Sequence, residues 1–138
     1  MPLYLADTSA WNRSNATEGI AERWAELVHA AQVAVCPPVL LELLYSARSP
    51  ADYTALRDEL AGLPNLPLSE QAVERALDTQ ATLAVRSQHR GPTPTDLLVA
   101  AIAEVNGATL LHYDPHFDVV TAETGQPAEW LARRGTLA

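Results

Sequence analysis

The stretch Leu3-Tyr4-Leu5-Ala6-Asp7-Thr8-Ser9 decides the fold, because a short apolar run ends at an acid and two hydroxyls. Continuous apolar runs are typical of strands in a sheet that is covered on both faces. In such sheets, ligands bind beyond the carboxyl ends of the strands. Asp7 therefore stands where chemistry can take place, and the rest of the chain decides whether other acids reach the same edge.

The composition is that of one globular domain, expected to span residues 1–138, with 48% hydrophobic and 19% charged residues. No apolar run is long enough to span a bilayer, and no basic residue precedes the first one, so we expect no membrane association, no signal peptide and a cytoplasmic location. The net charge is −8, and all nine basic residues are arginine. The lack of lysine excludes a lysine phosphate-binding loop and Schiff-base chemistry, whereas surplus acid suits divalent cations.

Apolar periodicity and capping residues predict helices that alternate with short strands. Strands are expected at 3–6, 33–36, 65–68, 109–113 and 119–121. Helices are expected at 9–13, 18–31, 37–47, 51–61, 69–88 and 97–105, with a terminal helical turn or two at 126–134. In the helix over 69–88, the residues expected to face inward are Val73, Leu77, Ala81 and Ala84. This alternation predicts a three-layer α/β/α sandwich, Rossmann-like, with a central parallel sheet of four to five strands.

Four acids are predicted to share one edge of this sheet. Asp7 and Asp114 directly follow strands, whereas Glu42 lies in the second turn of one helix and Asp96 at the start of another. Crossover helices run antiparallel to the strands, so helix N-termini and strand C-termini meet at one edge. Asp118, one helical turn after Asp114, is expected to join them. Clustered carboxylates repel and raise each other's pKa, so such a group indicates a hard cation such as Mg²⁺ or Mn²⁺.

Each acid also has an explanation that needs no function. Asp7 and Asp114 suit turns or helix caps. Asp96 completes a Thr-x-x-Asp capping box with Thr93, and Glu42 could simply face water. Independent caps need not share one edge, however, so the four together favour a site.

Four segments, in order, resemble the motifs of PIN-domain ribonucleases. They are Asp7-Thr8-Ser9, Val39-Leu40-Leu41-Glu42-Leu43, Thr93-Pro94-Thr95-Asp96-Leu97-Leu98-Val99-Ala100-Ala101 and Leu110-Leu111-His112-Tyr113-Asp114-Pro115-His116-Phe117, with an Asp-x-x-Phe signature in the last. The size is similar to that of VapC toxins of bacterial toxin–antitoxin systems. The resemblance covers essentially the whole chain and implies a PIN-like sandwich and a type II toxin that inhibits translation and growth. It also implies a homodimer and neutralisation by a cognate VapB-like antitoxin.

The same resemblance implies the chemistry of the site. RNA, with tRNA or rRNA as candidates, would be cleaved by in-line attack of a water activated by Mg²⁺ or Mn²⁺. Thr8 and Ser9 are expected to hydrogen-bond a carboxylate or a phosphate. Either Asp96 or Asp114 could orient the water instead of binding the ion. The implied catalytic residues and metal ligands are Asp7, Glu42, Asp96 and Asp114, with Asp118 as a further metal ligand.

Arginine and aromatic side chains are candidates for contacts with RNA and with the antitoxin. The arginines that suit contacts with the RNA backbone are Arg13, Arg48, Arg86 and Arg90. The aromatic residues expected to form an apolar groove for an antitoxin helix are Trp11, Trp24, Tyr45 and Tyr53.

Other functions fit the sequence less well. A receiver-like domain needs a lysine, and a metal-dependent phosphatase of the Asp-x-Asp type has an acid where Ser9 stands. A zinc site of His112, Asp114 and His116 would need a continuous strand, which Pro115 interrupts. A non-catalytic PIN-like binding protein normally lacks one or more of the acids, all of which are present here.

Overall fold

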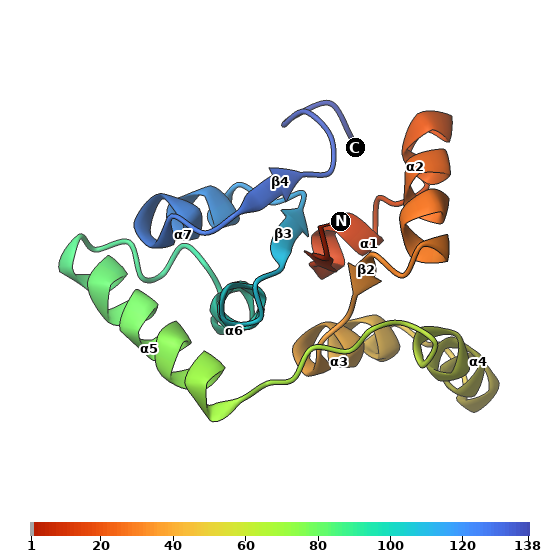
Figure 1. Ribbon diagram of the computed structural model, residues 1–138, viewed down its shortest axis with the longest axis horizontal. Coiled ribbons are helices and arrows are strands. Elements are labelled where there is room, and N and C mark those ends of the chain that lie inside the picture. Colours follow the sequence, from red (N-terminus) through yellow and green to blue (C-terminus); the bar gives the residue numbers. More distant parts are fainter. Residues whose placement is uncertain (1) are drawn as a thin grey trace.

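An all-parallel sheet of four strands, in the order β2-β1-β3-β4, forms the centre of the computed structural model, which describes residues 2–138 (Figure 1). Leu5 pairs with Ala34 of β2 and with Leu110 of β3, and Leu111 pairs with Glu129 of β4. The strands are β1 (Tyr4–Ala6), β2 (Val33–Ala34), β3 (Thr109–His112) and β4 (Ala128–Trp130).

Seven helices surround this sheet within the described residues. Four of them start at a Ser or Thr whose side chain accepts an N–H of the first turn, and three carry proline in that turn. These local signals explain why the starts of these five helices fall close to the predicted positions. The helices are α1 (Thr8–Trp11), α2 (Glu18–His29), α3 (Pro37–Tyr45), α4 (Pro50–Leu60), α5 (Glu70–Val85), α6 (Pro94–Val105) and α7 (His116–Thr124).

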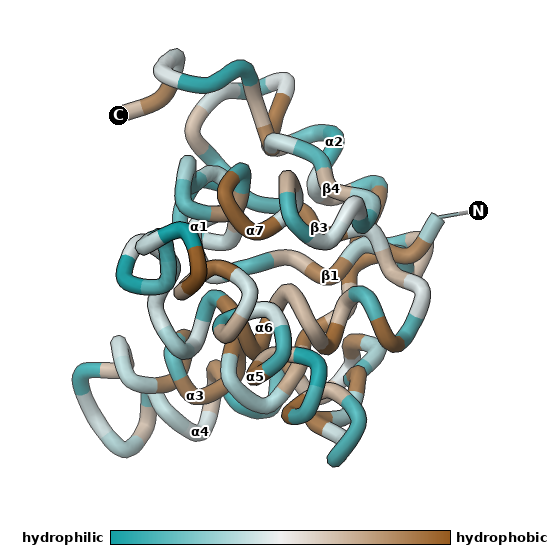
Figure 2. Tube along the Cα trace, turned by 90° about the vertical axis from the view of Figure 1, so that its left-hand side faces the viewer, coloured by the Kyte–Doolittle hydropathy of each residue, from teal (hydrophilic) through white to brown (hydrophobic). Residues whose placement is uncertain are grey.

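Two hydrophobic cores cover the two faces of the sheet. Leu5 and Leu110 belong to one core with α5, α6 and α7, whereas Tyr4 and Leu111 belong to the other with Trp24 of α2. Successive strand residues point to opposite faces of the sheet, so each strand contributes apolar side chains to both cores, and helices cover both faces. Figure 2 shows hydrophobic residues concentrated around β1 and α6, with α4 largely hydrophilic on the outside. The predicted α/β/α sandwich with a parallel sheet is confirmed.

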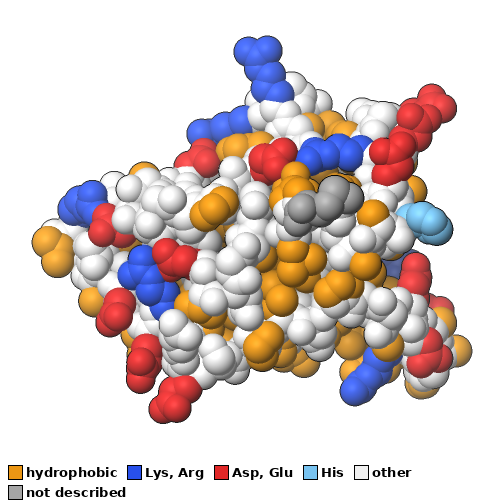
Figure 3. All heavy atoms as spheres, in the orientation of Figure 1, with side chains coloured by type: hydrophobic (Ala, Val, Ile, Leu, Met, Phe, Trp, Pro, Cys, Tyr) orange, Lys and Arg blue, Asp and Glu red, His pale blue; other side chains and the backbone are white. Residues whose placement is uncertain are grey.

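The surface carries mixed charge. On the face drawn in Figure 3, acidic side chains are interspersed with arginines around a hydrophobic centre. The acidic surplus is therefore spread over this face and forms no single patch on it. Among residues 2–138, no helix has the length and apolar character needed to cross a membrane.

Two predictions for the C-terminal part of the chain were wrong. The strand expected at 119–121 lies inside α7, because Phe117 and Val120 are spaced by three residues and are buried on one helical face. The helical turn expected at 126–134 is instead β4, which pairs with β3. The residues that pair with β4 lie 18 positions earlier in the chain, so no local pattern predicts this strand.

The prediction of a strand at 65–68 was also wrong. Only Asn65 forms a bridge, with Val35. Pro64 and Pro67 flank this position and have no N–H to donate to a ladder, which limits the pairing.

The face of α5 was predicted one residue out of register. Val73 and Leu77 are exposed, as are the two alanines predicted to be inward, Ala81 and Ala84. Small residues on the buried face let α5 pack closely on α6. The residues that α5 buries are Ala72, Ala76, Thr79 and Leu83.

Candidate active site

Asp7 is the first residue after β1 and lies at the carboxyl edge of the sheet. Its carboxylate accepts the backbone N–H of Ser9 at 2.9 Å and thereby caps α1. Only 5% of Asp7 is exposed. Burial raises the pKa of Asp7 to about 6, opposed by the hydrogen bonds from Ser9, and the charges of Asp96 and Glu42 raise it further. The charges of Asp96 and Glu42 therefore interact with Asp7 at this edge of the sheet.

Asp96 reaches the same edge from the first turn of α6. Its carboxylate accepts the backbone N–H of Thr93 at 2.9 Å, and its own N–H donates to the Thr93 hydroxyl at 3.1 Å. This capping box fixes the carboxylate at the helix start. Burial raises the pKa of Asp96, and the charge of Asp114 acts in the same direction.

Glu42 comes from the second turn of α3 and is exposed. Its Oε1 accepts the hydroxyl of Thr8 at 3.0 Å. The neighbouring Ser9 hydroxyl accepts the backbone N–H of Tyr113 at 2.9 Å. Thr8 and Ser9 thus tie the start of α1 to α3 and to the end of β3, as residues that support a site would do.

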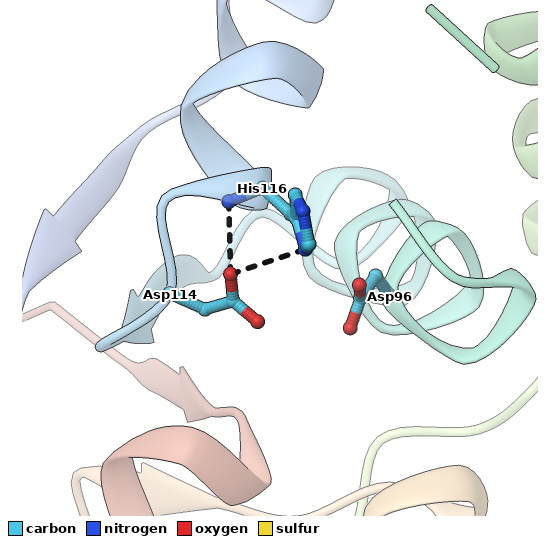
Figure 4. A group of neighbouring side chains, drawn as sticks. All are labelled: Asp96, Asp114 and His116. Carbon is cyan, nitrogen blue, oxygen red and sulfur yellow. Dashed lines mark hydrogen bonds and ion pairs between the residues drawn. The ribbon is translucent and has the colours of Figure 1, made fainter. Parts of the chain in front are cut away.

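Asp114 follows β3 and sits between two histidines. Its backbone N–H donates to Nδ1 of His112 at 3.2 Å, and its carboxylate accepts the N–H of His116 at 2.9 Å. One ligand atom each of Asp96, Asp114 and His116 lies within 4.8 Å of the others (Figure 4). Two acids and an imidazole therefore converge where α6 and α7 begin.

The two histidines on either side of Asp114 have different environments. His112 is buried between Phe117 and Trp130, with ring centroids at 5.0 and 4.9 Å. Burial lowers the pKa of His112. His116 is the first residue of α7 and turns toward Asp96 instead (Figure 4). In the sequence, His116 is a candidate ligand only together with His112, because no helix is predicted to start at this residue.

Asp118 has other partners. Its carboxylate accepts the indole N–H of Trp130 at 3.0 Å and lies 3.9 Å from Nη1 of Arg134. It is not a member of the group formed by Asp96, Asp114 and His116. The structure thus brings four predicted acids to one edge and directs the fifth toward the C-terminal segment.

The aromatic residues predicted to form one groove line separate depressions. Trp11 and Trp24 pack edge to face, with ring centroids at 4.8 Å, and line a depression of about 210 Å³ beside α4. Tyr53 lines an adjoining one of about 400 Å³ between α3 and α4, whereas Tyr45 lines a third beside Thr8. The prediction of a single four-residue groove was therefore wrong.

Comparison with known proteins agrees with this geometry. Residues 4–123 match the PIN domain family. The chain is 44% identical to the protein named Ribonuclease VapC18 of Mycobacterium tuberculosis, over 98% of this chain and 99% of that protein. It is 37% identical to Ribonuclease VapC51 of the same species, over 97% and 96%.

Solved structures share the fold. A DNA-bound VapBC complex from Salmonella typhimurium contains a chain that matches with a TM-score of 0.76 and 22% identity, covering 96% of this chain and all of that one. A VapBC2 complex from Rickettsia felis matches with a TM-score of 0.71 and 19% identity, over 93% and 98%. The resemblance read from the sequence is confirmed, and the chain belongs to the PIN-domain family, among the VapC ribonucleases.

Proposed function

We propose that this protein is the endoribonuclease toxin of a type II toxin–antitoxin module, acts in the cytoplasm and needs Mg²⁺ or Mn²⁺. The observation that carries the proposal is the meeting of four acids at one edge of the sheet. Two of them, Asp7 and Asp114, follow strands, and the other two, Glu42 and Asp96, come from the first two turns of helices. The relatives that match over nearly the whole chain are named ribonucleases, which supports RNA as the substrate.

The residues at this edge fit a hard divalent cation. Carboxylate oxygens are the ligands that Mg²⁺ and Mn²⁺ prefer. Within residues 2–138, none of the ion pairs made by arginine involves Asp7, Glu42 or Asp96. No arginine among them therefore offsets the burial and the charges of Asp96 and Glu42 that raise the pKa of Asp7. Asp7, Glu42, Asp96 and Asp114 would hold the ion, which when bound supplies an acidic water and positive charge next to the phosphate.

The chain itself orients these carboxylates. Ser9 and Thr93 each fix one carboxylate through a backbone N–H, and Thr8 fixes Glu42 through its hydroxyl. Because these hydrogen bonds fix the carboxylates of Asp7, Asp96 and Glu42, the group is preorganised before substrate arrives. Asp118 is left out of the proposed site because Trp130 and Arg134 engage its carboxylate.

A cationic side chain lies beside the edge. Arg13 donates to the carbonyl of Ser9 at 3.1 Å, and its guanidinium stacks 4.9 Å above the ring of Tyr113. An arginine held in this way is suited to contact an RNA phosphate. Among the other arginines suggested by the sequence, Arg86 pairs with Glu123.

The adjoining depressions beside α4 suit an apolar partner segment. Both are lined by Leu60 and Leu63, and together they run from Trp24 to Tyr53. We assign them to the VapB-like antitoxin, whose amphipathic segment would place apolar side chains there.

An apolar face of α3 and α5 is proposed to form a homodimer. Leu98 of α6 lines two depressions, one with Leu41 and Tyr45 and the other with Val73 and Leu77. Tyr45 is 92% exposed and Leu77 60%. Thr8 and Glu42 line the first depression as well, so a second copy on this face would lie beside the carboxylates. Contiguous exposed apolar surface of this kind marks an interaction site.

Cleavage of a structured RNA tests the proposed function. The purified protein is expected to cut such RNA with Mg²⁺ or Mn²⁺ and to stop when a chelator is added. Asp7→Asn and Asp96→Asn should abolish cleavage while keeping the fold, because an amide oxygen can still accept the helix-capping hydrogen bond. Asp78→Asn, on the exposed side of α5, serves as the matched control.

The outcomes of this assay are clear. Full activity of Asp7→Asn and Asp96→Asn would refute the proposal. Sequencing of the RNA ends made by the wild type and absent with Asp7→Asn would identify the substrate and show whether it is a tRNA or an rRNA.

A further inference from the structure

The imidazole of His116 lies close to the carboxylates of both Asp96 and Asp114. Its Nδ1 is 3.4 Å from Oδ1 of Asp114, and a ligand atom of Asp96 completes a triangle with sides within 4.8 Å. Figure 4 shows the ring between the two carboxylates. In an octahedral site with bonds of about 2.1 Å, neighbouring ligand atoms are about 3 Å apart and opposite ones about 4.2 Å. The three atoms can therefore share one ion after small side-chain rotations.

The backbone holds His116 in this place. Its N–H donates to Asp114 at 2.9 Å, so the two residues form a tight turn at the start of α7. Gly91 lies near the ring, because a Cβ added there would be 3.9 Å from Cδ2 of His116. The imidazole, whose side chain is 51% exposed, thus has the loop before α6 and the carboxylate of Asp114 as neighbours.

We propose that His116 supplies a nitrogen ligand to the cation held by Asp96 and Asp114, and that the site consequently prefers transition-metal ions such as Mn²⁺ to Mg²⁺. This inference rests on the proposed function, of which it specifies the metal. Mg²⁺ favours oxygen ligands and keeps its waters, whereas imidazole binds first-row transition ions well. One nitrogen among carboxylates therefore shifts the preference without changing the charge of the acids.

Pulsed electron paramagnetic resonance of the Mn²⁺-loaded protein tests this ligand directly. The wild type is expected to show coupling of Mn²⁺ to a ¹⁴N nucleus, and His116→Gln to lose it, because glutamine offers only its amide oxygen as a metal ligand. His89→Gln, exposed in the loop before α6, is the matched control and should keep the coupling.

Calorimetry on the same proteins measures the preference for the metal. Loss of a supporting residue around a metal typically lowers affinity 10–100-fold, so loss of a ligand in His116→Gln should lower Mn²⁺ affinity at least about tenfold. Mg²⁺ affinity should change by less than about threefold, because Mg²⁺ favours oxygen ligands. The ratio of the two affinities is then the quantity that the variant changes.

The results separate this inference from the proposed function. Mn²⁺ that binds without ¹⁴N coupling, or a His116→Gln variant with an unchanged ratio of Mn²⁺ to Mg²⁺ affinity, would overturn the nitrogen ligand even if RNA is cleaved. Coupling that disappears only in His116→Gln supports the ligand, even if no RNA is cut and the proposed function fails. No measurable Mn²⁺ binding would overturn the inference as well.

Discussion

The hydroxyl of Thr8 donates a hydrogen bond to Oε1 of Glu42 at 3.0 Å, across 34 residues of sequence. Thr8 is the first residue of α1, and Glu42 is the exposed acid of α3. This bond fixes an exposed carboxylate whose charge raises the pKa of the buried Asp7. The two helices thereby act together on the site, although each belongs to a different crossover of the sheet.

Removal of this hydroxyl should weaken metal binding without unfolding the protein. Thr8→Val keeps the size and the branched shape of the side chain, so it removes only the hydrogen bond. We expect Mg²⁺ and Mn²⁺ affinity to fall about tenfold, as is typical for residues that orient a metal ligand. Calorimetric titration measures the affinity, and thermal unfolding checks the fold.

The matched control for this substitution is Thr82→Val on α5. The hydroxyl of Thr82 donates only to the carbonyl of Asp78, far from the site in sequence and exposed. Equal metal affinity in both variants would show that the bond between Thr8 and Glu42 has no role in orienting the ligand.

The stability of the metal-free protein should depend on the ionisation of Asp7. Its pKa is raised from 3.8 to about 6 in the fold, so the folded state favours the neutral acid. The protonated carboxyl therefore contributes to the free energy of unfolding. This contribution is fully present below pH 4 and is lost as the pH rises through about 6, and it amounts to on the order of 3 kcal/mol. With chelator present, Asp7→Asn should therefore be more stable than the wild type at pH 7.5 and lack this slope.

Urea unfolding of both proteins between pH 4 and pH 8 measures this difference. Asp58→Asn, exposed on α4, should follow the wild-type curve throughout. Added Mn²⁺ should restore the wild type but not Asp7→Asn, because the ion replaces the proton. Parallel curves for the wild type and Asp7→Asn would contradict the coupling of charge and stability.

Much of this molecule follows from local sequence. The segment Thr93-Pro94-Thr95-Asp96 contains a cap, a helix-starting proline and an acid, so it predicts both where α6 begins and where its carboxylate lies. The apolar run that ends at Asp7 does the same for β1. Parallel topology then brings the four acids to one edge, since strand ends and helix starts coincide there.

The parts that could not be predicted depend on distant partners. β4 exists because β3 offers a free edge, and its own residues are mostly exposed. The position of His116 depends on the start of α7, which is decided by the Asp114 turn and by burial of Phe117 against the sheet. The buried face of α5 was missed because the small Ala72 and Ala76, rather than the larger Val73 and Leu77, are buried.

Two glycines should respond in opposite directions to the same substitution. Gly125 ends α7 with φ of +69°, a conformation that costs an alanine roughly 1 kcal/mol. Gly19 lies in the first turns of α2, and nothing lies within 4 Å of an added Cβ. Gly125→Ala should lower, and Gly19→Ala raise, the free energy of unfolding by about 0.5–1 kcal/mol. Urea unfolding measures both, and shifts of the same sign would contradict the assignment of the α7 cap.

The proposed dimer face predicts which exposed apolar residue controls the oligomeric state. Leu77 and Val85 both lie on α5 and are 60% and 85% exposed, but only Leu77 lines the depression shared with Leu98. Leu77→Glu would place a charge in the interface, where it would be buried without a partner, and should convert the dimer to a monomer. Val85→Glu carries the same charge outside the face and should remain dimeric. Light scattering after size exclusion at micromolar concentration distinguishes the two, and a monomeric wild type, or a dimeric Leu77→Glu, would rule out this face as the interface.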